Sequence, residues 1–143
     1  MKVSLREIEP ADLPVLYEHQ ADPVAIAMAA FPPREYDSFI EHWEQSLADE
    51  TIVARTIVAD GRVAGHVVSF LRDGRREVGY WIGRELWGGG IATAALEQLL
   101  RIETRRPLYA GVASHNAGSL RVLAKCGFAV AGRDGDHVIL RLD

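Results

Sequence analysis

A tryptophan followed by three glycines, at positions 87–90, separates a strand-like segment at 78–82 from an amphipathic segment that begins near Ile91. Three consecutive glycines cost backbone entropy on folding, which is reasonable where another molecule must approach the main chain closely. A glycine loop that opens a helix turns unpaired N–H groups outward, and the helix dipole adds partial positive charge. This arrangement is typical of a phosphate-binding site. The alternative interpretation is a flexible connector.

The loop differs from two common phosphate-binding motifs. No Gly-Lys-Ser/Thr follows Gly90, so it is not a Walker loop. Thr93 stands where the dinucleotide fingerprint requires a third Gly or Ala after Gly88 and Gly90. The nature of the ligand must therefore be inferred from other parts of the chain.

Composition excludes several classes of function. The 143 residues are 48% hydrophobic and 25% charged, with a formal net charge of -4, as in an ordinary soluble domain. We therefore expect no nucleic-acid partner, and we interpret the arginine clusters at 72–76 and 101–106 as solvated surface charge. The one cysteine, Cys126, excludes an intramolecular disulfide and a cysteine-rich metal site. No secretory signal or apolar run of about 20 residues is present, which favours a cytoplasmic location without membrane contact.

The first part of the chain predicts a strand, helices and an antiparallel meander. Apolar residues at helical spacing indicate a helix from Pro10 to about Gln20, a short helical piece through Ile26 and Met28, and a helix at 36–48. The strand segments are 2–6, 51–59, 62–71 and 77–82. The dipeptides at 60–61 and 73–74, both Asp-Gly, predict tight hairpin turns between the last three.

The second part predicts a parallel crossover. We expect a helix from Ile91, a strand at 108–112, a helix capped by Asn116 and ended by Gly127, and a hairpin of strands at 128–133 and 137–142. The core-facing residues of the two helices are predicted to be Ile91, Ala94, Ala95, Leu99, Ile102, Leu120, Leu123 and Ala124. The chain is thus predicted to be one α/β domain, residues 1–143, in the order β-α-α-β-β-β-α-β-α-β-β.

Two motifs together resemble those of the GNAT superfamily of N-acetyltransferases. Gly90 and Ala92 match the small positions of the acyl-CoA motif Gln/Arg-x-x-Gly-x-Gly/Ala, and Trp87 stands at its first position. That departure, with the strand Gly-Tyr-Trp-Ile at 79–82, resembles the branch of ribosomal-protein N-terminal acetyltransferases. The segment 116–128 is similar to the Asn-x-x-Ser…Lys-x-Gly-Phe helix of the same superfamily.

The resemblance implies a mixed, mostly antiparallel sheet flanked by helices, with the parallel crossover at the CoA site. Acetyl-CoA would be the donor, and its pantetheine arm would lie between the splayed fourth and fifth strands, with Ile82 near the thioester. Asn116 would reach that arm, or serve only as a helix cap. The residues that the resemblance assigns to the donor are Trp81, Ile82, Trp87, Gly88, Gly89, Gly90, Ile91, Ala92, Thr93 and Asn116.

Acyl transfer to an amine requires a neutral amine, a polarised thioester carbonyl and a stabilised or protonated leaving thiolate. Glu77 is the preferred base candidate, and its alternative role is that of a charge partner for nearby arginines. His115 and His66 are weaker candidates for the base. A backbone N–H near Ile82 would polarise the carbonyl.

The general acid must differ from that of many relatives, because Leu123 stands where they carry a tyrosine in the Asn helix. Ser119 is the candidate that the resembling branch suggests, and its alternative role is to permit close approach of CoA. Tyr80 and Tyr109 are further options. Cys126 is interpreted as a buried filler and not as a nucleophile, so we expect direct transfer in a ternary complex without a metal.

The acceptor is expected to be an amine-bearing small molecule or a peptide N-terminus. Its pocket would involve the first two helices, with Phe31 as a wall, whereas Tyr36, Phe39 and Trp43 are predicted to be core. Two other functions stay open: a CoA-sensing module with little catalysis, and a binding domain for an unrelated phosphate ligand. Dimers are common among relatives, so a homodimer is an open alternative.

Overall fold

Seven strands form one sheet in the order β1-β2-β3-β4-β5-β7-β6 in this computed structural model, which describes residues 1–30 and 32–143. The strands are β1 (Val3–Arg6), β2 (Val53–Ala59), β3 (Arg62–Arg72), β4 (Arg75–Ile82), β5 (Leu108–Ala113), β6 (Ala129–Asp134) and β7 (His137–Leu142). The pair β4–β5 is parallel and the other neighbouring pairs are antiparallel. The predicted mixed, mostly antiparallel fold with one parallel crossover is confirmed.

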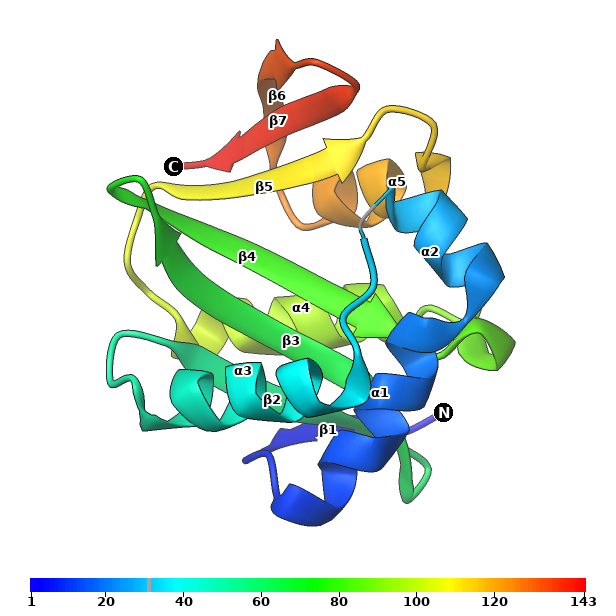
Figure 1. Cartoon of the computed structure of the whole chain (residues 1–143). Helices are drawn as coiled ribbons and strands as arrows, with labels where there is room; N and C mark the ends of the chain where they lie inside the picture. The colour runs from blue at the N-terminus through cyan, green and yellow to red at the C-terminus, as the bar shows by residue number, and fades with distance from the viewer. Residues whose placement is uncertain (31) are drawn as a thin grey trace.

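Within the described residues, five α-helices flank this sheet: α1 (Leu13–Ala21), α2 (Pro23–Ala29), α3 (Tyr36–Ala48), α4 (Ile91–Ile102) and α5 (Ala117–Lys125). Figure 1 shows α1 and α3 in front of the sheet, α4 behind it, and α5 beside β5. The short helical piece is a full helix, α2, because the Asp22 carboxylate caps it by accepting from the Val24 N–H at 2.9 Å. None of the described helices is long and apolar enough to cross a membrane.

The main hydrophobic core lies between the sheet and α4, and a second cluster lies under α1 and α3. Phe39 and Trp43 are buried in the second cluster, as predicted, but Tyr36 is 44% exposed. Tyr36 opens α3, where its ring packs edge-on against Tyr17 at the rim of the cluster. The prediction of Tyr36 as core was therefore wrong.

The buried faces of the two later helices also differ in part from the prediction. In α4 the buried residue next to Ala95 is Leu96, whereas Ile102, in the last turn, is 46% exposed. In α5 Leu123 is buried but Ala124 is exposed, and Val122 packs against the core instead. The helix ends were predicted correctly: Asn116 caps α5, and Gly127 follows it with a positive φ of 95°.

The strands β4 and β5 separate soon after they meet. Their recorded register pair among the described residues is Glu77 with Tyr109, near the start of both strands. Figure 1 shows the two strands diverging from that end toward α2 and α5. Because β4 stays paired with β3 up to Ile82, its other edge faces an open gap between β4 and β5. The expected splay is present.

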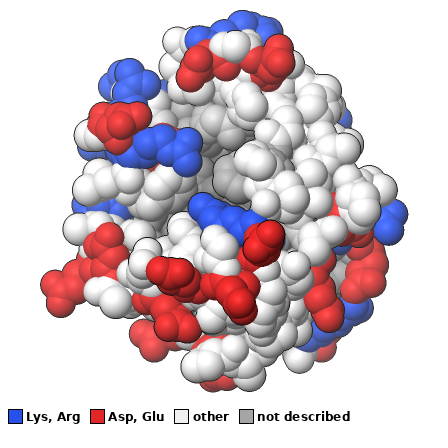
Figure 2. Space-filling model, viewed as in Figure 1, with Lys and Arg blue, Asp and Glu red and all other residues white. Residues whose placement is uncertain are grey.

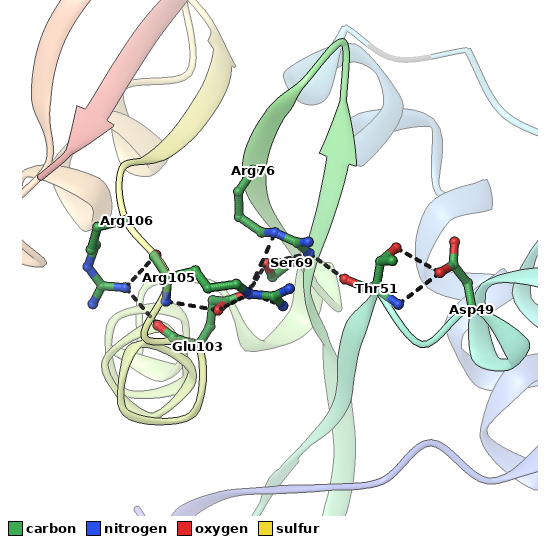
Figure 3. Close-up of polar contacts among 7 residues, drawn as sticks. All are labelled: Asp49, Thr51, Ser69, Arg76, Glu103, Arg105 and Arg106. Carbon is green, nitrogen blue, oxygen red and sulfur yellow. Dashed lines mark hydrogen bonds and ion pairs between the residues drawn. The ribbon is translucent and has the colours of Figure 1, made fainter.

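A buried polar network ties the end of α4 to β3 and β4 (Figure 3). The Glu103 carboxylate accepts from Ser69 Oγ at 2.6 Å and lies 3.8 Å from the Arg76 guanidinium, and Arg105 contacts it at 2.8 Å. Arg76 also donates to the Thr51 carbonyl. The interpretation of the arginine clusters as surface charge was therefore wrong for Arg76, which is 8% exposed. Its network fixes the start of β4 next to Glu77.

Candidate active site

The glycine loop leads directly into α4. Gly88 and Gly90 adopt positive φ values of 80° and 81°, and Gly90 is the N-cap residue of the helix. These angles favour glycine over any residue with a Cβ. A Cβ at either position would meet nothing within 4 Å, so the loop faces open space. The first N–H groups of α4 have no acceptor within the helix and are free for a ligand.

The Trp87 side chain attaches the glycine loop to β4 by a hydrogen bond. Its indole Nε1 donates to the carbonyl oxygen of Ile82 at 2.9 Å, which fastens the loop to the end of β4. One lone pair of that carbonyl is therefore already used by the protein. Arg84, in the 3-10 turn between them, is 2.7 Å from Asp22 and ties the same region to the start of α2.

A cavity of about 550 Å³ extends from this loop between α4, α5 and α2. We call it the loop cavity. Its walls include the predicted donor residues Trp81, Ile82, Trp87, Gly88, Gly90, Ile91, Ala92, Thr93 and Asn116. Arg121 and Lys125 of α5 also line it, although neither was among the donor residues predicted from the sequence. The sequence signal for them was their i, i+4 spacing in the helix that Asn116 caps, because this spacing places two cations on one face of the helix.

A second cavity, of about 760 Å³, opens on the sheet face that α1 and α3 leave uncovered. It lies between the turn that joins β3 to β4 and the β6–β7 hairpin, and Figure 2 shows this face hollowed, with charged side chains of both signs at its border. Glu77 lines it, together with His137, which no motif in the sequence indicated.

The two cavities meet at the gap between β4 and β5. The residues common to both are Ala29, Tyr80, Trp81, Asn116 and Ser119. The Tyr80 hydroxyl lies 2.6 Å from Ser119 Oγ, so β4 and α5 are joined by a hydrogen bond at this place. A ligand in one cavity can therefore contact a ligand in the other beside these shared residues, which include Tyr80 and Ser119.

Asn116 forms the helix cap considered for it, and its contact with the pantetheine arm stays a prediction. Its Oδ1 accepts from the Ser119 N–H at 3.1 Å, which is an N-cap of α5. Its side chain also lines both cavities, and the amide NH2 group stays available as a donor toward the gap. The cap thus orients the amide for a ligand.

Glu77 is a charge partner of a nearby arginine, which is one of its two predicted roles, and its role as the base stays a prediction. Its carboxylate is 3.8 Å from the Arg72 guanidinium, and its side chain is 18% exposed within the second cavity. Burial raises the pKa of Glu77 above its ordinary value, although Arg72 opposes the shift. A carboxylate with a raised pKa is a stronger base, which suits a group that accepts a proton.

The two histidines are placed less favourably than Glu77. His66 is partly buried against the Trp43 ring, with centroids 4.9 Å apart, and desolvation lowers its pKa to about 4. It lines neither cavity. His115 lines the loop cavity, where its Nε2 is 3.0 Å from the carbonyl of Ala27 and so links α5 to α2. Of the three predicted bases, Glu77 alone lines the second cavity.

The remaining acid and nucleophile candidates are separated by their surroundings. Burial raises the pKa of Tyr80, so its hydroxyl keeps its proton at neutral pH. Tyr109 lines neither cavity and instead carries the Arg75 guanidinium 4.5 Å above its ring. Cys126 is partly buried, with Sγ 3.9 Å from the Thr93 carbonyl, and burial raises its pKa. A protonated thiol in this position is a poor nucleophile.

Two expectations concern residues away from these groups. Phe31, the expected wall of the acceptor pocket, lies outside the described residues. Among residues 1–30 and 32–143, no group of three or more His, Cys, Asp or Glu side chains is arranged to hold a metal ion.

Residues 2–129 match the family model described as an acetyltransferase (GNAT) domain. No curated protein matches the chain by sequence similarity. Among solved structures, an acetyltransferase from Thermus thermophilus is 18% identical, with a TM-score of 0.83 over 99% of this chain and 97% of that one. Spermidine N-acetyltransferase from Vibrio cholerae, in complex with CoA and spermine, is 19% identical, with a TM-score of 0.81 over 97% and 92%.

A third similar structure is RimL, a ribosomal-protein alpha-N-acetyltransferase in complex with coenzyme A. It is 16% identical to this chain, with a TM-score of 0.83 over 99% of this chain and 94% of that one. At such identities the three structures show that the fold is shared.

Proposed function

The chain belongs to the GNAT acetyltransferase family, and we propose that it transfers an acetyl group from acetyl-CoA to a primary amine by direct attack in a ternary complex. The observation that carries this proposal is the meeting of the two cavities at the gap between β4 and β5. One cavity has the features of a donor site, and the other contains the candidate base. From here the second cavity is called the acceptor groove.

The loop cavity suits acetyl-CoA in shape and charge. The N–H groups from Gly88 to Thr93 can hold the pyrophosphate at the positive end of α4. Arg121 and Lys125 add positive charge to the same cavity. The unpaired edges of β4 and β5 can bind the amide groups of pantetheine as a strand would. This binding mode would bring the thioester to Tyr80 and Ser119.

The chemistry follows from the groups at the junction. Glu77 takes a proton from the ammonium group of the acceptor through water, because three residues of β4, about 10 Å, separate it from Tyr80. The neutral amine attacks the thioester carbonyl, which a backbone N–H near Ile82 polarises. A C–N bond forms as the C–S bond breaks, and the proton that the nitrogen loses passes through the Tyr80–Ser119 pair to the leaving thiolate, so both hydroxyls end neutral. Because both reactants are held beside these groups, no covalent intermediate on the protein is needed.

Two classes of acceptor are consistent with this site. Among the similar structures, one acetylates spermidine and another acts on the N-terminus of a ribosomal protein, according to their names. We propose for this chain either an amine-bearing small molecule or a protein N-terminus. Figure 2 shows charges of both signs around the opening, so charge alone does not exclude either class.

A catalytically weak sensor of CoA or acetyl-CoA is the second candidate. It is favoured by Leu123, which is buried in α5 where many relatives carry the tyrosine acid. A sensor would bind acetyl-CoA as tightly as an enzyme does but would acetylate no amine. We also propose that the protein is cytoplasmic and that it can form a homodimer. Cell fractionation tests the first proposal and the molar mass in solution tests the second.

Thermal unfolding with acetyl-CoA, compared with ADP and with no ligand, tests donor binding. A ligand at about 100 times its dissociation constant adds roughly 2.7 kcal/mol of stability. We expect a clear upward shift with acetyl-CoA and a much smaller one with ADP, because ADP cannot fill the gap between β4 and β5. No shift at millimolar acetyl-CoA would reject both the enzyme and the sensor.

A further inference from the structure

The floor of the acceptor groove lacks side chains on both sides of the gap. Gly79 on β4 and Gly111 on β5 each lie two residues beyond the register pair formed by Glu77 and Tyr109. Because side chains alternate along a strand, these positions face the same side of the sheet as Glu77 and Tyr109. Both glycines line the groove.

The backbone does not require glycine at these positions. Neither Gly79 nor Gly111 is among the residues with positive φ. A Cβ at Gly79 would be 3.8 Å from Val68 Cγ1, and one at Gly111 would be 3.8 Å from Ile139 Cδ1, which are ordinary contacts. Glycine weakens a strand interior and often marks a close approach by another molecule. The two positions thus leave a trough that the packing of the protein itself does not need.

Two guanidinium groups stand at the closed end of this trough. Arg72 and Arg75 are register partners beside the turn between β3 and β4. The guanidinium carbon of Arg72 is 5.4 Å from the centre of the Phe70 ring, and that of Arg75 is 4.5 Å from the centre of the Tyr109 ring. The Glu77 carboxylate is 3.8 Å from Arg72 and interacts with Arg75 at longer range, whereas no carboxylate of the described residues lies within ion-pair distance of Arg75. Its charge is held in place and is available to an anion.

The distance along the groove sets the length of the ligand. Arg75 lies five residues before Tyr80 on β4, which corresponds to about 17 Å at a rise of roughly 3.4 Å per residue. The amine must react beside Tyr80 and Ser119. An extended chain of four residues spans about 13–14 Å at roughly 3.3–3.6 Å per residue, and the side chain of its fourth residue together with that of Arg75 covers the remainder.

On the basis of the proposed function, we infer that the acceptor is an extended primary amine with an anionic group at its far end. Its chain lies over Gly79 and Gly111, and the anion lies between Arg72 and Arg75. A peptide N-terminus with an acidic residue near the fourth position has this chemistry, as does a long-chain amino acid with its amine and carboxylate at opposite ends. A cationic far end, drawn to Asp73 in the same turn, is the competing arrangement.

Three amidated tetrapeptides that differ only in the fourth residue, Glu, Gln or Lys, test this inference by their kcat/KM with acetyl-CoA. We expect the Glu peptide to exceed the Gln peptide by about fivefold, as for one partly exposed charge pair, and the Lys peptide to be the poorest. A long-chain amino acid with its amine and carboxylate at opposite ends, and the alkylamine of equal length, are tested as small-molecule acceptors. Faster turnover of the amino acid than of the peptides would assign the same anion recognition to a small molecule.

Variants connect the preference to the groove. Arg75→Gln should bring the Glu-to-Gln ratio close to one, and Arg75→Glu should favour the Lys peptide. Arg101→Gln, at an exposed position of α4 outside both cavities, is the matched control and should leave the Glu-to-Gln ratio unchanged. Gly111→Ala should raise KM for every tetrapeptide without lowering the midpoint of urea unfolding, because its Cβ fits the fold but fills the trough.

Equal rates for the three peptides, or a preference for Lys, would overturn the inference. Failure of the proposed function has a different signature, in which acetyl-CoA binds but no amine is acetylated. In that case, equilibrium binding of the same peptides to the CoA-loaded protein tests whether the groove recognises an anion. Tighter binding of the Glu peptide that is lost in Arg75→Gln supports the inference, and equal or weaker binding rejects it.

Discussion

The Tyr80 hydroxyl and Ser119 Oγ lie 2.6 Å apart and join β4 to α5 where the two cavities meet. The two residues are 39 positions apart in the sequence, and only the fold brings them together. Because burial raises the pKa of Tyr80, the pair contains a proton donor that stays neutral over the physiological range. The structure therefore offers a source for the proton that the missing tyrosine at Leu123 would have supplied.

Ser119→Ala should lower kcat by about 10- to 100-fold, at the low end for general acid catalysis because a CoA thiolate is a fair leaving group. Tyr80→Phe should lower it less, since Ser119 remains. The acetyl-CoA dissociation constant should change less than about twofold in both. Steady-state release of CoA thiol and calorimetric binding provide the two measurements. Tyr109→Phe, outside both cavities, is the control, and an unchanged kcat in Ser119→Ala would remove the pair from the mechanism.

Glu77→Gln should slow acetyl transfer more than it weakens acetyl-CoA binding. In the wild type the rate should rise with pH as Glu77 loses its proton, and this rise lies above the ordinary carboxyl range because burial raises the pKa. The variant should lose that limb of the pH–rate profile. Asp73→Asn changes a nearby carboxylate in the same groove and should keep the limb. A wild-type profile in Glu77→Gln would exclude it as the base.

Gly90→Asp should abolish measurable acetyl-CoA binding, because it places a carboxylate where the pyrophosphate is proposed to lie. The positive φ of 81° adds backbone strain of roughly 1–2 kcal/mol. Gly61→Asp is a matched control, with a φ of 80° and equally open space in the β2–β3 turn. Both variants should unfold at similarly lower temperatures, but only Gly90→Asp should lose the ligand. Equal acetyl-CoA affinity in the two would contradict the loop assignment.

His66→Phe should make the protein less sensitive to mild acid. Burial lowers the pKa of His66 from 6.5 to about 4, so the folded state excludes a proton that the unfolded chain binds. Stability is therefore lost as pH falls from about 6.5 to 4, by about 2 kcal/mol between pH 7 and 5. His19 and His42, whose pKa values burial also lowers, act in the same direction. Urea unfolding at both pH values should show a smaller loss in the variant, and an equal loss would reject the assignment.

Glu103→Gln should lower the free energy of unfolding by about 3 kcal/mol, because it leaves the buried Arg76 guanidinium without its carboxylate. Its hydrogen bonds hold the pKa of Glu103 at about 2, below the ordinary 4.5. The stability from this shift is present above pH 4.5 and disappears as pH falls toward 2, and the variant should lack that decline. Glu97→Gln, on the exposed face of α4, should change stability by less than about 0.5 kcal/mol.

Local sequence signals predicted most elements and the loop. The Asp60-Gly61 and Asp73-Gly74 turns have positive φ at all four residues, and the Asn116 cap is formed by its own side chain. Such features depend on a few neighbouring residues, so the sequence contains the information directly. The parallel crossover followed from the strand-helix-strand order at 78–113.

What the sequence did not predict depends on contacts between distant segments. Arg76 is buried because Glu103 and Ser69 approach it from α4 and β3, and no local pattern distinguishes it from exposed Arg75. Tyr80 became a strong candidate for a proton donor only through its contact with Ser119, which the structure revealed. The acceptor side was predicted least well, because its groove is formed by two hairpins that lie far apart in the chain.

Direct acetyl transfer in a ternary complex is tested most directly by measuring the release of CoA thiol over a matrix of acetyl-CoA and acceptor concentrations, with the tetrapeptides as acceptors. Transfer in a ternary complex at the β4–β5 gap predicts amine-dependent release and initial-velocity lines that intersect. Acetyl-CoA binding with thiol release that is the same with and without amine would contradict the account, and the sensor would become the better description.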